Sequence, residues 1–248
     1  MDFGLAGRVV LITGGTRGLG LAMARGFAGE GARVIVSSRK AEACEAVAAE
    51  LRGLGVEAAG IPANVSHWDQ CDRLAAEAWD RFGRIDVLIN NAGLSPLAPS
   101  SVETSEALFD KVVAVNYKGP FRLTSLIGAK MVAAGGGSII NISSTGALNP
   151  QPNSIPYSGA KAALNAASVA FAREYGPSVR VNVISPGGFL TDVAAESDWK
   201  DNPEITRRIA LKRFGEAGEI VAAALYLASD VSSYTSGANL RIDGGGGG

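Results

Sequence analysis

The sequence has few of the residues that bind metals or form disulfides. It contains two cysteines, Cys44 and Cys71, without CxxC spacing, and one histidine, His67. So few ligands predict neither a disulfide framework nor a zinc site, and one histidine at the expected start of a helix gives little support for a histidine-dependent catalytic triad. We therefore expect both thiols to be small buried or partly buried side chains, and we expect no metal in the functional site.

The sequence also lacks an excess of charge of either sign. Lys and Arg together number 23 and Asp and Glu 24, with no basic run, so nucleic acids and anionic membranes are poor candidate partners. No apolar run approaches the ~18 residues of a membrane-spanning helix, and residues 1–8 lack the pattern of a signal peptide. These absences favour a cytoplasmic protein that binds a small molecule.

No linker divides the chain. Its 248 residues are 47% hydrophobic and show no shift in composition, so we expect one domain spanning residues 1–248. The expected strands are residues 9–12, 33–37, 56–61, 85–90, 138–142, 179–184 and 239–242. The expected helices are residues 21–30, 41–52, 67–81, 104–134, 157–174 and 219–228. Strands apolar enough for burial on both faces, alternating with helices, predict an α/β fold with a doubly wound, parallel, seven-stranded sheet and helices on both faces.

A glycine-rich turn follows the first expected strand and opens the first expected helix. It reads TGGTRGLG over residues 13–20, with glycines at 14, 18 and 20. Glycine lets the backbone turn tightly, and it lets a phosphate approach the amides at the start of a helix. The spacing differs from the common Gly-x-Gly-x-x-Gly of dinucleotide-binding proteins, and no Gly-Lys-Ser/Thr follows. An anion-binding turn and an ordinary strand-to-helix turn are both consistent with this stretch.

The end of the second expected strand carries the signal for cofactor choice. Cofactors of such sheets bind beyond the carboxyl ends of the strands, where a carboxylate would hold the free ribose hydroxyl of NAD. Here Ser38 and Arg39 follow the strand, and the first acid is Glu42. Arg39 and Arg17, from the glycine turn, favour the 2′-phosphate of NADP instead. The alternative is that both arginines are solvated surface residues.

Two further strand ends carry weaker signals. Asn64 and Val65 follow the third strand, and they suit either a contact with an adenine or a plain turn. The run Asn-Asn-Ala-Gly at residues 90–93 offers small residues where a ribose needs clearance, but asparagine-rich turns are common. Neither signal is specific without the glycine turn.

The most informative group is YSGAK at residues 157–161, with Ser144 at the end of the fifth expected strand. Tyr157 and Lys161 are four residues apart and share a helix face. Lowering the pKa of a tyrosine to near neutrality takes ~4 kcal/mol, and an ammonium ~5 Å away supplies ~3 kcal/mol at an effective dielectric of ~20. We expect Tyr157 to transfer a proton, Lys161 to lower its pKa, and Ser144 to donate a hydrogen bond to a substrate carbonyl oxygen. An ordinary amphipathic helix face would contain the same pair.

The long expected helix at residues 104–134 contains Pro120. Proline has no amide hydrogen, so the carbonyl of Asn116 loses its helical partner. A freed carbonyl is a place to hold a water molecule. A kink that serves packing alone is the other interpretation.

Taken together, TGGTRGLG, NNAG, Asn116, Ser144 and YSGAK resemble the short-chain dehydrogenase/reductase family, in order and over almost the whole chain. The resemblance implies a single Rossmann-type domain with the catalytic set Asn116, Ser144, Tyr157 and Lys161. Asn64 stands where many members carry Asp. The resemblance also implies a cofactor site formed by Gly14, Thr16, Arg17, Gly18, Leu19, Gly20, Ser38, Arg39, Asn64, Val65, Asn91, Ala92, Gly93, Tyr157, Lys161, Pro186, Gly187 and Thr191.

The resemblance is to the NADP-preferring, 3-oxoacyl-reductase-like branch of the family. It implies reversible hydride transfer between NADP(H) and a carbonyl or secondary alcohol, with reduction of a ketone or 3-oxoacyl group as the cellular direction. Residues 190–213 are expected to form a substrate lid. By analogy with the family, the long helices and the C-terminal tail are expected to form the contacts of a homo-oligomer, a tetramer or a dimer.

Two alternatives for the function stay open. An NAD-dependent alcohol or sugar-acid dehydrogenase would use the same fold and differ in its affinity for NAD. A non-catalytic, cofactor-binding sensor would need only the motifs in the first half of the chain, and the complete catalytic set argues against it. The substrate is not identified, because the candidate pocket residues are mostly apolar or small: Ser95, Pro96, Leu97, Thr145, Leu148, Gln151, Ile155, Gly188 and Phe189.

Overall fold

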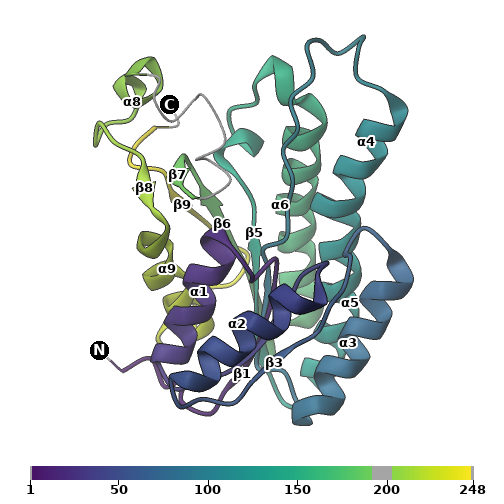
Figure 1. The fold of residues 1–248 in the computed structure, drawn as a ribbon, viewed down its shortest axis with the longest axis vertical. Coiled ribbons are helices and arrows are strands. Elements are labelled where there is room, and N and C mark those ends of the chain that lie inside the picture. Colours follow the sequence, from purple (N-terminus) through teal and green to yellow (C-terminus); the bar gives the residue numbers. More distant parts are fainter. Residues whose placement is uncertain (1, 192–202, 247–248) are drawn as a thin grey trace.

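A parallel sheet of seven strands forms the centre of the protein (Figure 1). The computed structural model describes residues 2–191 and 203–246. The strand order is β3-β2-β1-β4-β5-β6-β9, and each neighbouring pair is parallel. The strands are β1 (Val9–Thr13), β2 (Arg33–Ser37), β3 (Ala58–Gly60), β4 (Val87–Asn90), β5 (Gly137–Ile142), β6 (Val179–Pro186) and β9 (Asn239–Ile242). The prediction of a doubly wound α/β sheet is confirmed.

Helices cover both faces of this sheet, because successive residues of a strand point to opposite sides. Val10 and Ile12 of β1 belong to a core with helices α1, α2 and α9, whereas Val9 and Leu11 belong to a core with α3, α5 and α6. Figure 1 shows the two helix layers on either side of the strands. The helices of these layers are α1 (Gly18–Gly29), α2 (Ala41–Gly53), α3 (Trp68–Phe82), α5 (Gly119–Ala133), α6 (Ile155–Tyr175) and α9 (Val221–Ala228).

The expected helix at residues 104–134 contains a π-helical turn. It consists of α4 (Glu106–Val113), a π-helical turn η1 (Ala114–Lys118) and α5. The N–H of Gly119 donates to the carbonyl of Ala114, five residues earlier. Pro120, which has no N–H for the carbonyl of Asn116, lies in the first turn of α5, so the chain takes up the irregularity just before the proline. The prediction of a long helical segment is confirmed over residues 106–133, and the irregularity expected near Pro120 is a π-helical turn within it.

The strand order determines where a site can form. From β1 the chain continues to β2 and β3 on one side of the sheet and then returns to β4 on the other side of β1. Such a reversal opens a crevice beyond the carboxyl ends of the strands. The segments that follow β1 and β4, residues 14–20 and 91–93, lie at this crevice.

A second, small sheet extends the same end of the molecule. Strands β7 (Phe189–Leu190) and β8 (Gly215–Glu216) pair in parallel, and helix α8 (Pro203–Arg208) lies between them in the sequence. Short helical turns complete the chain: η2 (Thr145–Ala147), η3 (Pro152–Ser154), η5 (Ala217–Ile220) and η6 (Asp230–Ser232).

Candidate active site

The glycine turn leaves the start of α1 without a cap. Helix α1 begins at Gly18, the preceding Arg17 makes no side-chain capping bond, and the first turn contains no acidic residue. Gly14 and Gly18 have φ values of +63° and +53°, which favour glycine. The amides of the first helical turn have no partners within the helix and carry the positive end of its dipole. This end of the helix therefore suits an anionic group such as a pyrophosphate.

The turn is held in place by the segment that follows β4. The Oγ1 of Thr13 accepts from the N–H groups of Asn91 and Ala92, both at 3.1 Å. The Nδ2 of Asn91 donates to the carbonyls of Thr13 at 2.9 Å and Gly14 at 3.1 Å. A Cβ at Gly20 would lie 2.2 Å from the carbonyl oxygen of Gly14 and 2.5 Å from the Nδ2 of Asn91, so the turn and the segment after β4 pack too closely for any larger residue there. Sequence reasoning did not identify Thr13, whose only signal was a hydroxyl at the end of an apolar strand.

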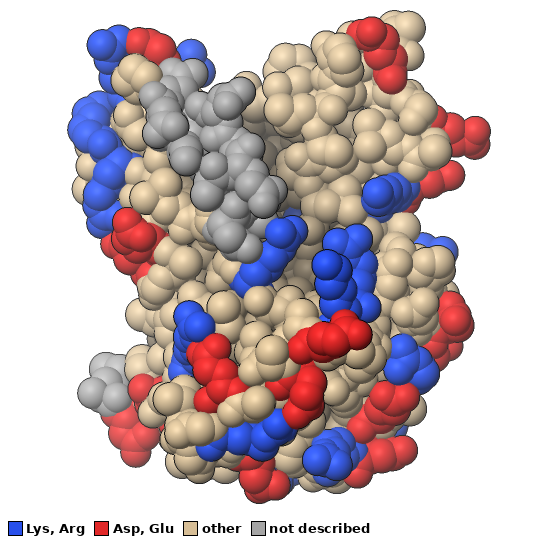
Figure 2. All heavy atoms as spheres, in the orientation of Figure 1, with Lys and Arg blue, Asp and Glu red and all other residues tan. Residues whose placement is uncertain are grey.

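The residues expected to choose the cofactor lie beside this turn. Ser38 is partly buried, whereas Arg39 and Arg17 are exposed. Figure 2 shows basic side chains at the lower edge of the central hollow, over the N-terminal ends of α1 and α2. The N–H of Ser38 donates to the Sγ of Cys44 at 3.1 Å. Cys44 and Cys71 are both buried free thiols, as expected, and burial raises the pKa of Cys71 to about 11.

Asn64 forms a local turn in the structure. The Oδ1 of Asn64 accepts from the N–H of Ser66 at 3.2 Å and from the hydroxyl of Ser66 at 2.9 Å. The N–H of Asn64 donates to the Oε1 of Gln70 at 2.8 Å. Val65 is buried and its carbonyl oxygen would lie 2.2 Å from a Cβ at Gly119. These contacts account for both residues as a turn, which was one of the two interpretations of the sequence. The adenine contact stays a prediction.

The structure brings Asn116 and Lys161 together around a glycine. Asn116 is fully buried, and its Nδ2 donates to the carbonyls of Leu94 at 2.8 Å and Val112 at 2.9 Å. A Cβ at Gly93 would lie 3.0 Å from the Oδ1 of Asn116 and 3.6 Å from the Nζ of Lys161. Glycine at this position therefore allows the π-helical turn η1 and helix α6 to approach the end of β4.

Ser144 and Tyr157 form the other half of the cluster. The Oγ of Ser144 accepts from the N–H of Gly146 at 3.0 Å, which orients the hydroxyl at the end of β5. A Cβ at Gly146 would lie 3.3 Å from this Oγ and 3.7 Å from the Cε1 of Tyr157. Ser144 and Tyr157 are also hydrogen-bonded, and this bond lowers the pKa of the phenol. All four residues of the expected catalytic set thus lie at the carboxyl end of the sheet.

Burial dominates the electrostatics of the cluster. Burial raises the pKa of Tyr157 by more than the bond from Ser144 lowers it, so its pKa is above the ordinary value. Lys161 is 3% exposed, and burial lowers its pKa to about 7. Its Nζ donates to the carbonyl of Ile142 at 2.8 Å and lies 5.9 Å from the centroid of the Tyr157 ring. Burial is thus the largest influence on the phenol and on the ammonium in this structure, and the lowering of the Tyr157 pKa by Lys161 stays a prediction.

The segment after β6 completes the crevice. Pro186 ends β6, and the N–H of Gly187 donates to the carbonyl of Ile242 at 2.9 Å. Thr191 is partly buried and directly precedes residues 192–202. The expected lid at residues 190–213 falls partly on 192–202, which lie outside the described residues. Its described part comprises Leu190, Thr191, α8 and the residues that lead from α8 to β8.

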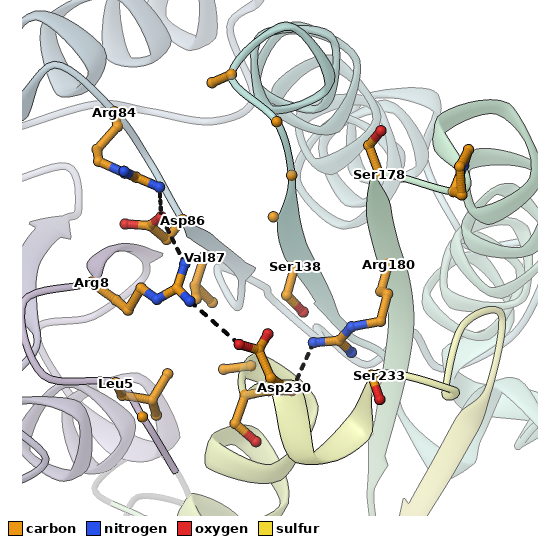
Figure 3. Close-up of a pocket in the computed structure, with 18 residues that line it drawn as sticks. Leu5, Arg8, Arg84, Asp86, Val87, Ser138, Ser178, Arg180, Asp230 and Ser233 are labelled. Carbon is orange, nitrogen blue, oxygen red and sulfur yellow. Dashed lines mark hydrogen bonds and ion pairs between the residues drawn. The ribbon is translucent and has the colours of Figure 1, made fainter.

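A cavity of about 370 Å³ lies at the opposite end of the sheet, at the amino ends of the strands (Figure 3). Its lining includes three arginines and two aspartates, and two of the arginines pair with the aspartates. Arg8 lies 3.4 Å from both Asp86 and Asp230, Arg84 also pairs with Asp86, and Arg180 donates at 3.0 Å to a carbonyl at the end of α9. Helices α5, α6 and α9 all end beside this cavity, so their negative dipole ends account for the extra positive charge. We interpret it as a structural charge network.

The described part of the chain contains no group of three His, Cys, Asp or Glu residues placed to hold a metal ion. His67 precedes α3 and makes no capping bond with its side chain. None of the helices that the structure describes is long and apolar enough to cross a membrane.

Comparisons with known proteins agree with this geometry. The family model for short chain dehydrogenases matches residues 8–202. The chain belongs to the short-chain dehydrogenase/reductase family. It is therefore an oxidoreductase, as the sequence motifs predicted, of a family that uses a nicotinamide cofactor.

Three relatives illustrate the range of the family around this chain. D-threitol dehydrogenase of Mycolicibacterium smegmatis is 37% identical over 246 residues, which cover 98% of this chain and 94% of the relative. The 3-oxoacyl-acyl-carrier-protein reductase of Thermotoga maritima is 36% identical over 242 residues, covering 97% and 98%. A structure of a variant actinorhodin polyketide ketoreductase with NADPH superposes with a TM-score of 0.91 at 31% identity, covering 97% of each chain. Substrate and cofactor preference are thus not determined by family membership.

Proposed function

We propose that this protein is an NADP(H)-dependent oxidoreductase that transfers hydride reversibly between the nicotinamide and a carbonyl or secondary alcohol. Reduction of a ketone or 3-oxoacyl group is the proposed cellular direction. The observation that carries the proposal is the convergence of Ser144, Tyr157, Lys161 and Asn116 beside the uncapped start of α1. A proton-transfer group and an anion-binding helix terminus at one crevice are what a dinucleotide-dependent reductase requires.

The described residues fit a dinucleotide. The amides at the start of α1 are available for a pyrophosphate, and Gly14, Gly18 and Gly20 keep the turn free of side chains. When bound, the nicotinamide would supply or accept the hydride. We assign to the cofactor site the residues predicted from the sequence: Gly14, Thr16, Arg17, Gly18, Leu19, Gly20, Ser38, Arg39, Asn64, Val65, Asn91, Ala92, Gly93, Tyr157, Lys161, Pro186, Gly187 and Thr191.

The side chains of the cluster have separable roles in this mechanism. Tyr157 donates its proton to the carbonyl oxygen during reduction, and its raised pKa keeps the phenol protonated until then. Ser144, oriented by the N–H of Gly146, donates a hydrogen bond to the same oxygen. Lys161, with a pKa of about 7, exchanges a proton readily near neutral pH and can return one to the phenolate. Asn116 holds the 93–94 segment against this group through its bonds to Leu94.

The preference for NADP rests on charge at the end of β2. No acid lies between Ser37 and Ala41, and the exposed Arg39 and Arg17 flank the same crevice. A bidentate guanidinium favours a phosphate dianion over a hydroxyl. Since both arginines are exposed, solvent screens them, and the preference for NADP over NAD should be one to two decades, about 1.4 to 2.8 kcal/mol.

A second candidate is an NAD-dependent alcohol or sugar-acid dehydrogenase. The identity of 37% with a D-threitol dehydrogenase supports this candidate, because that relative is named for a polyol substrate. The two candidates share the catalytic cluster and differ in the cofactor and the direction of the reaction.

The decisive experiment is a substrate panel followed by nicotinamide absorbance at 340 nm. Ketones and 3-oxoacyl thioesters are offered with NADPH and with NADH, and polyols and sugar acids with NADP and NAD. We expect NADPH-dependent reduction of at least one carbonyl class. Oxidation of polyols with NAD alone would favour the second candidate, and a panel without turnover would favour a cofactor-binding sensor.

We further infer a homo-oligomer, a tetramer or a dimer, in the cytoplasm. Large apolar side chains are exposed on the α4 to α6 layer, where Phe109 is 50% and Phe121 37% exposed, and Tyr234 is fully exposed beyond η6. Exposed apolar side chains mark subunit contacts where they form a contiguous patch, and we propose that those on the α4 to α6 layer do so. Size-exclusion chromatography with light scattering tests this inference, and a monomer at micromolar concentration would contradict it.

A further inference from the structure

The C-terminal turn at residues 243–246 touches both segments that would border the reacting groups. On one side, a Cβ at Gly187 would lie 2.7 Å from the Cβ of Asp243, and the N–H of Gly187 donates to the carbonyl of Ile242. On the other side, the N–H of Leu211 donates to the carbonyl oxygen of Gly244 at 3.0 Å. Figure 1 shows the C-terminal end of the described chain beside α8. One short turn thus links residues 186–188 with residues 209–211.

Positions 244 and 245 of this turn accept no residue larger than glycine without displacing neighbouring atoms. Gly244 and Gly245 have φ values of +62° and +78°, a conformation that L side chains rarely adopt. A Cβ at Gly244 would lie 2.9 Å from the Cγ2 of Ile209, and a Cβ at Gly245 would lie 2.8 Å from the Cβ of Ala210. Asp243 closes the turn by accepting from the N–H of Gly245 at 3.0 Å. The close fit indicates that the turn determines where residues 209 and 210 lie.

Residues 209–212, which the turn contacts, have a constrained backbone of their own. Lys212 has a φ of +56°, the only positive φ of a non-glycine residue in the described part of the chain. Such a conformation persists only where surrounding contacts enforce it. The contacts here are the bond of Leu211 to Gly244, the bond from the N–H of Lys212 to the carbonyl of Ile209 at 3.0 Å, and the bond from its Nζ to Arg207 at 2.7 Å. The segment is therefore held in place against its local conformational preference.

We propose that Gly244 and Gly245 are positioning residues: the turn at 243–246 sets the separation between residues 186–188 and residues 209–211. On the proposed function, the first of these segments passes the nicotinamide and the second belongs to the substrate lid expected at residues 190–213. The turn therefore acts through Gly187 and Leu211, and it touches no reacting atom itself.

The test uses Gly245→Ala with Gly237→Ala as the matched control. Gly237, at the other end of β9, has nearly the same φ, +76°, but its nearest neighbour to a Cβ is 3.7 Å away. Both variants bear a similar backbone cost, so a difference between them reports the contact with Ala210. Gly245→Asn keeps the clash while easing the backbone cost, because asparagine tolerates this conformation.

Limited trypsin digestion provides a measurement that does not depend on activity. Residues 207–212, which include the segment that the turn contacts, contain three exposed trypsin sites: Arg207, Arg208 and Lys212. Cleavage at these sites reports how often residues 207–212 are displaced from the turn. We expect Gly245→Ala and Gly245→Asn to be cleaved at these sites about fivefold faster than the wild type, and Gly237→Ala within about twofold of it. In Gly245→Ala/Ala210→Gly, compared with Ala210→Gly alone, the increase should disappear. Cleavage of Gly245→Ala at the rate of Gly237→Ala, or an increase that survives the second substitution, would overturn the proposal.

Steady-state kinetics then connect the turn with the reaction. For any carbonyl that the wild type reduces, Gly245→Ala should raise KM about fivefold or more and leave the Kd of NADPH within about twofold. An unchanged KM would overturn the positioning role even where cleavage is faster. If the wild type reduces no carbonyl, the proposed function fails, while the digestion still decides whether the turn holds the segment.

Discussion

The two ends of the sheet carry charge in opposite ways. At the amino end of the strands, the cavity of Figure 3 contains Arg8, Arg84 and Arg180, and these are compensated by aspartates and by carbonyls at helix ends. At the carboxyl end, α1 begins without a cap, and Lys161 is buried against a backbone carbonyl. The amino end has a cavity lined by several charged groups, but these already have partners in one another and in backbone carbonyls. A site is indicated by groups whose interactions are incomplete, and these lie at the carboxyl end.

The largest expected effect tests whether the carboxyl end contains the chemistry. Tyr157→Phe should lower kcat by about three decades or more, because the proton donor is removed. The Kd of NADPH should stay within a few-fold. Tyr175→Phe is the control. Tyr175 lies at the far end of α6 from Tyr157, where its hydroxyl donates to the carbonyl of Ser125 on α5. If Tyr157→Phe retains activity, Tyr157 is not the proton donor.

The next effect concerns the stability cost of the buried lysine. The folded-state pKa of Lys161 is about 7 and its unfolded value is about 10.5, so between these pH values the unfolded chain binds more protons. Lys161 therefore lowers the free energy of unfolding progressively as pH falls from about 10.5 to 7, by a few kcal/mol in total. Below pH 7 this effect changes little. Urea unfolding of the wild type and Lys161→Met across this range should give a difference that grows towards pH 7. A difference independent of pH would mean that the lysine stays charged in the folded state.

A smaller effect tests cofactor choice at the same end of the sheet. Arg39→Asp should weaken NADPH binding by one to two decades and leave NADH binding nearly unchanged, because only NADPH carries the 2′-phosphate. Fluorescence titration with both cofactors measures the ratio. Arg33→Asp is not a suitable control, since Arg33 bonds to the carbonyl of Gly7; Arg208→Asp, on the exposed α8, is better matched. An unchanged ratio in Arg39→Asp would remove Arg39 from the cofactor site.

The smallest effect tests the interpretation of the amino end as purely structural. Asp86→Asn leaves Arg8 and Arg84 without their shared carboxylate, and should cost about 1 to 2 kcal/mol of unfolding free energy, since both arginines are partly exposed. The kcat/KM of the folded protein should not change. A loss of activity larger than the loss of folded protein would show that the two ends of the sheet are coupled.

The fold was predictable because its signals are local and repeated. Each strand is an apolar run and each helix an amphipathic pattern, so their order alone indicates a parallel sheet. The errors occurred where a neighbour decides the outcome. Near Pro120 the helix contains a π-helical turn where regular α-helix was expected, and β3 keeps only three residues as an edge strand paired with β2 alone.

The candidate site was predictable in its members but not in its interactions. Residue types and spacing identified Tyr157, Lys161 and Ser144, because a helix face and a strand end are local properties. The direction of the pKa shift of Tyr157 was not predictable, since desolvation depends on what covers the side chain. The same holds for Asn91, whose amide holds the glycine turn. Its role as a brace needs the end of β4 to lie beside the end of β1.

The amino-acid sequence by itself determined the order of strands and helices, the family, and which residues stand at strand ends, because these follow from patterns within a few residues. Tertiary structure alone decided which of those residues are buried and which polar atoms have hydrogen-bond partners. It also decided that the turn at 243–246 contacts residues 209–211. Burial and long-range contact depend on segments far apart in the chain, and the pattern of either segment alone contains no information about the other.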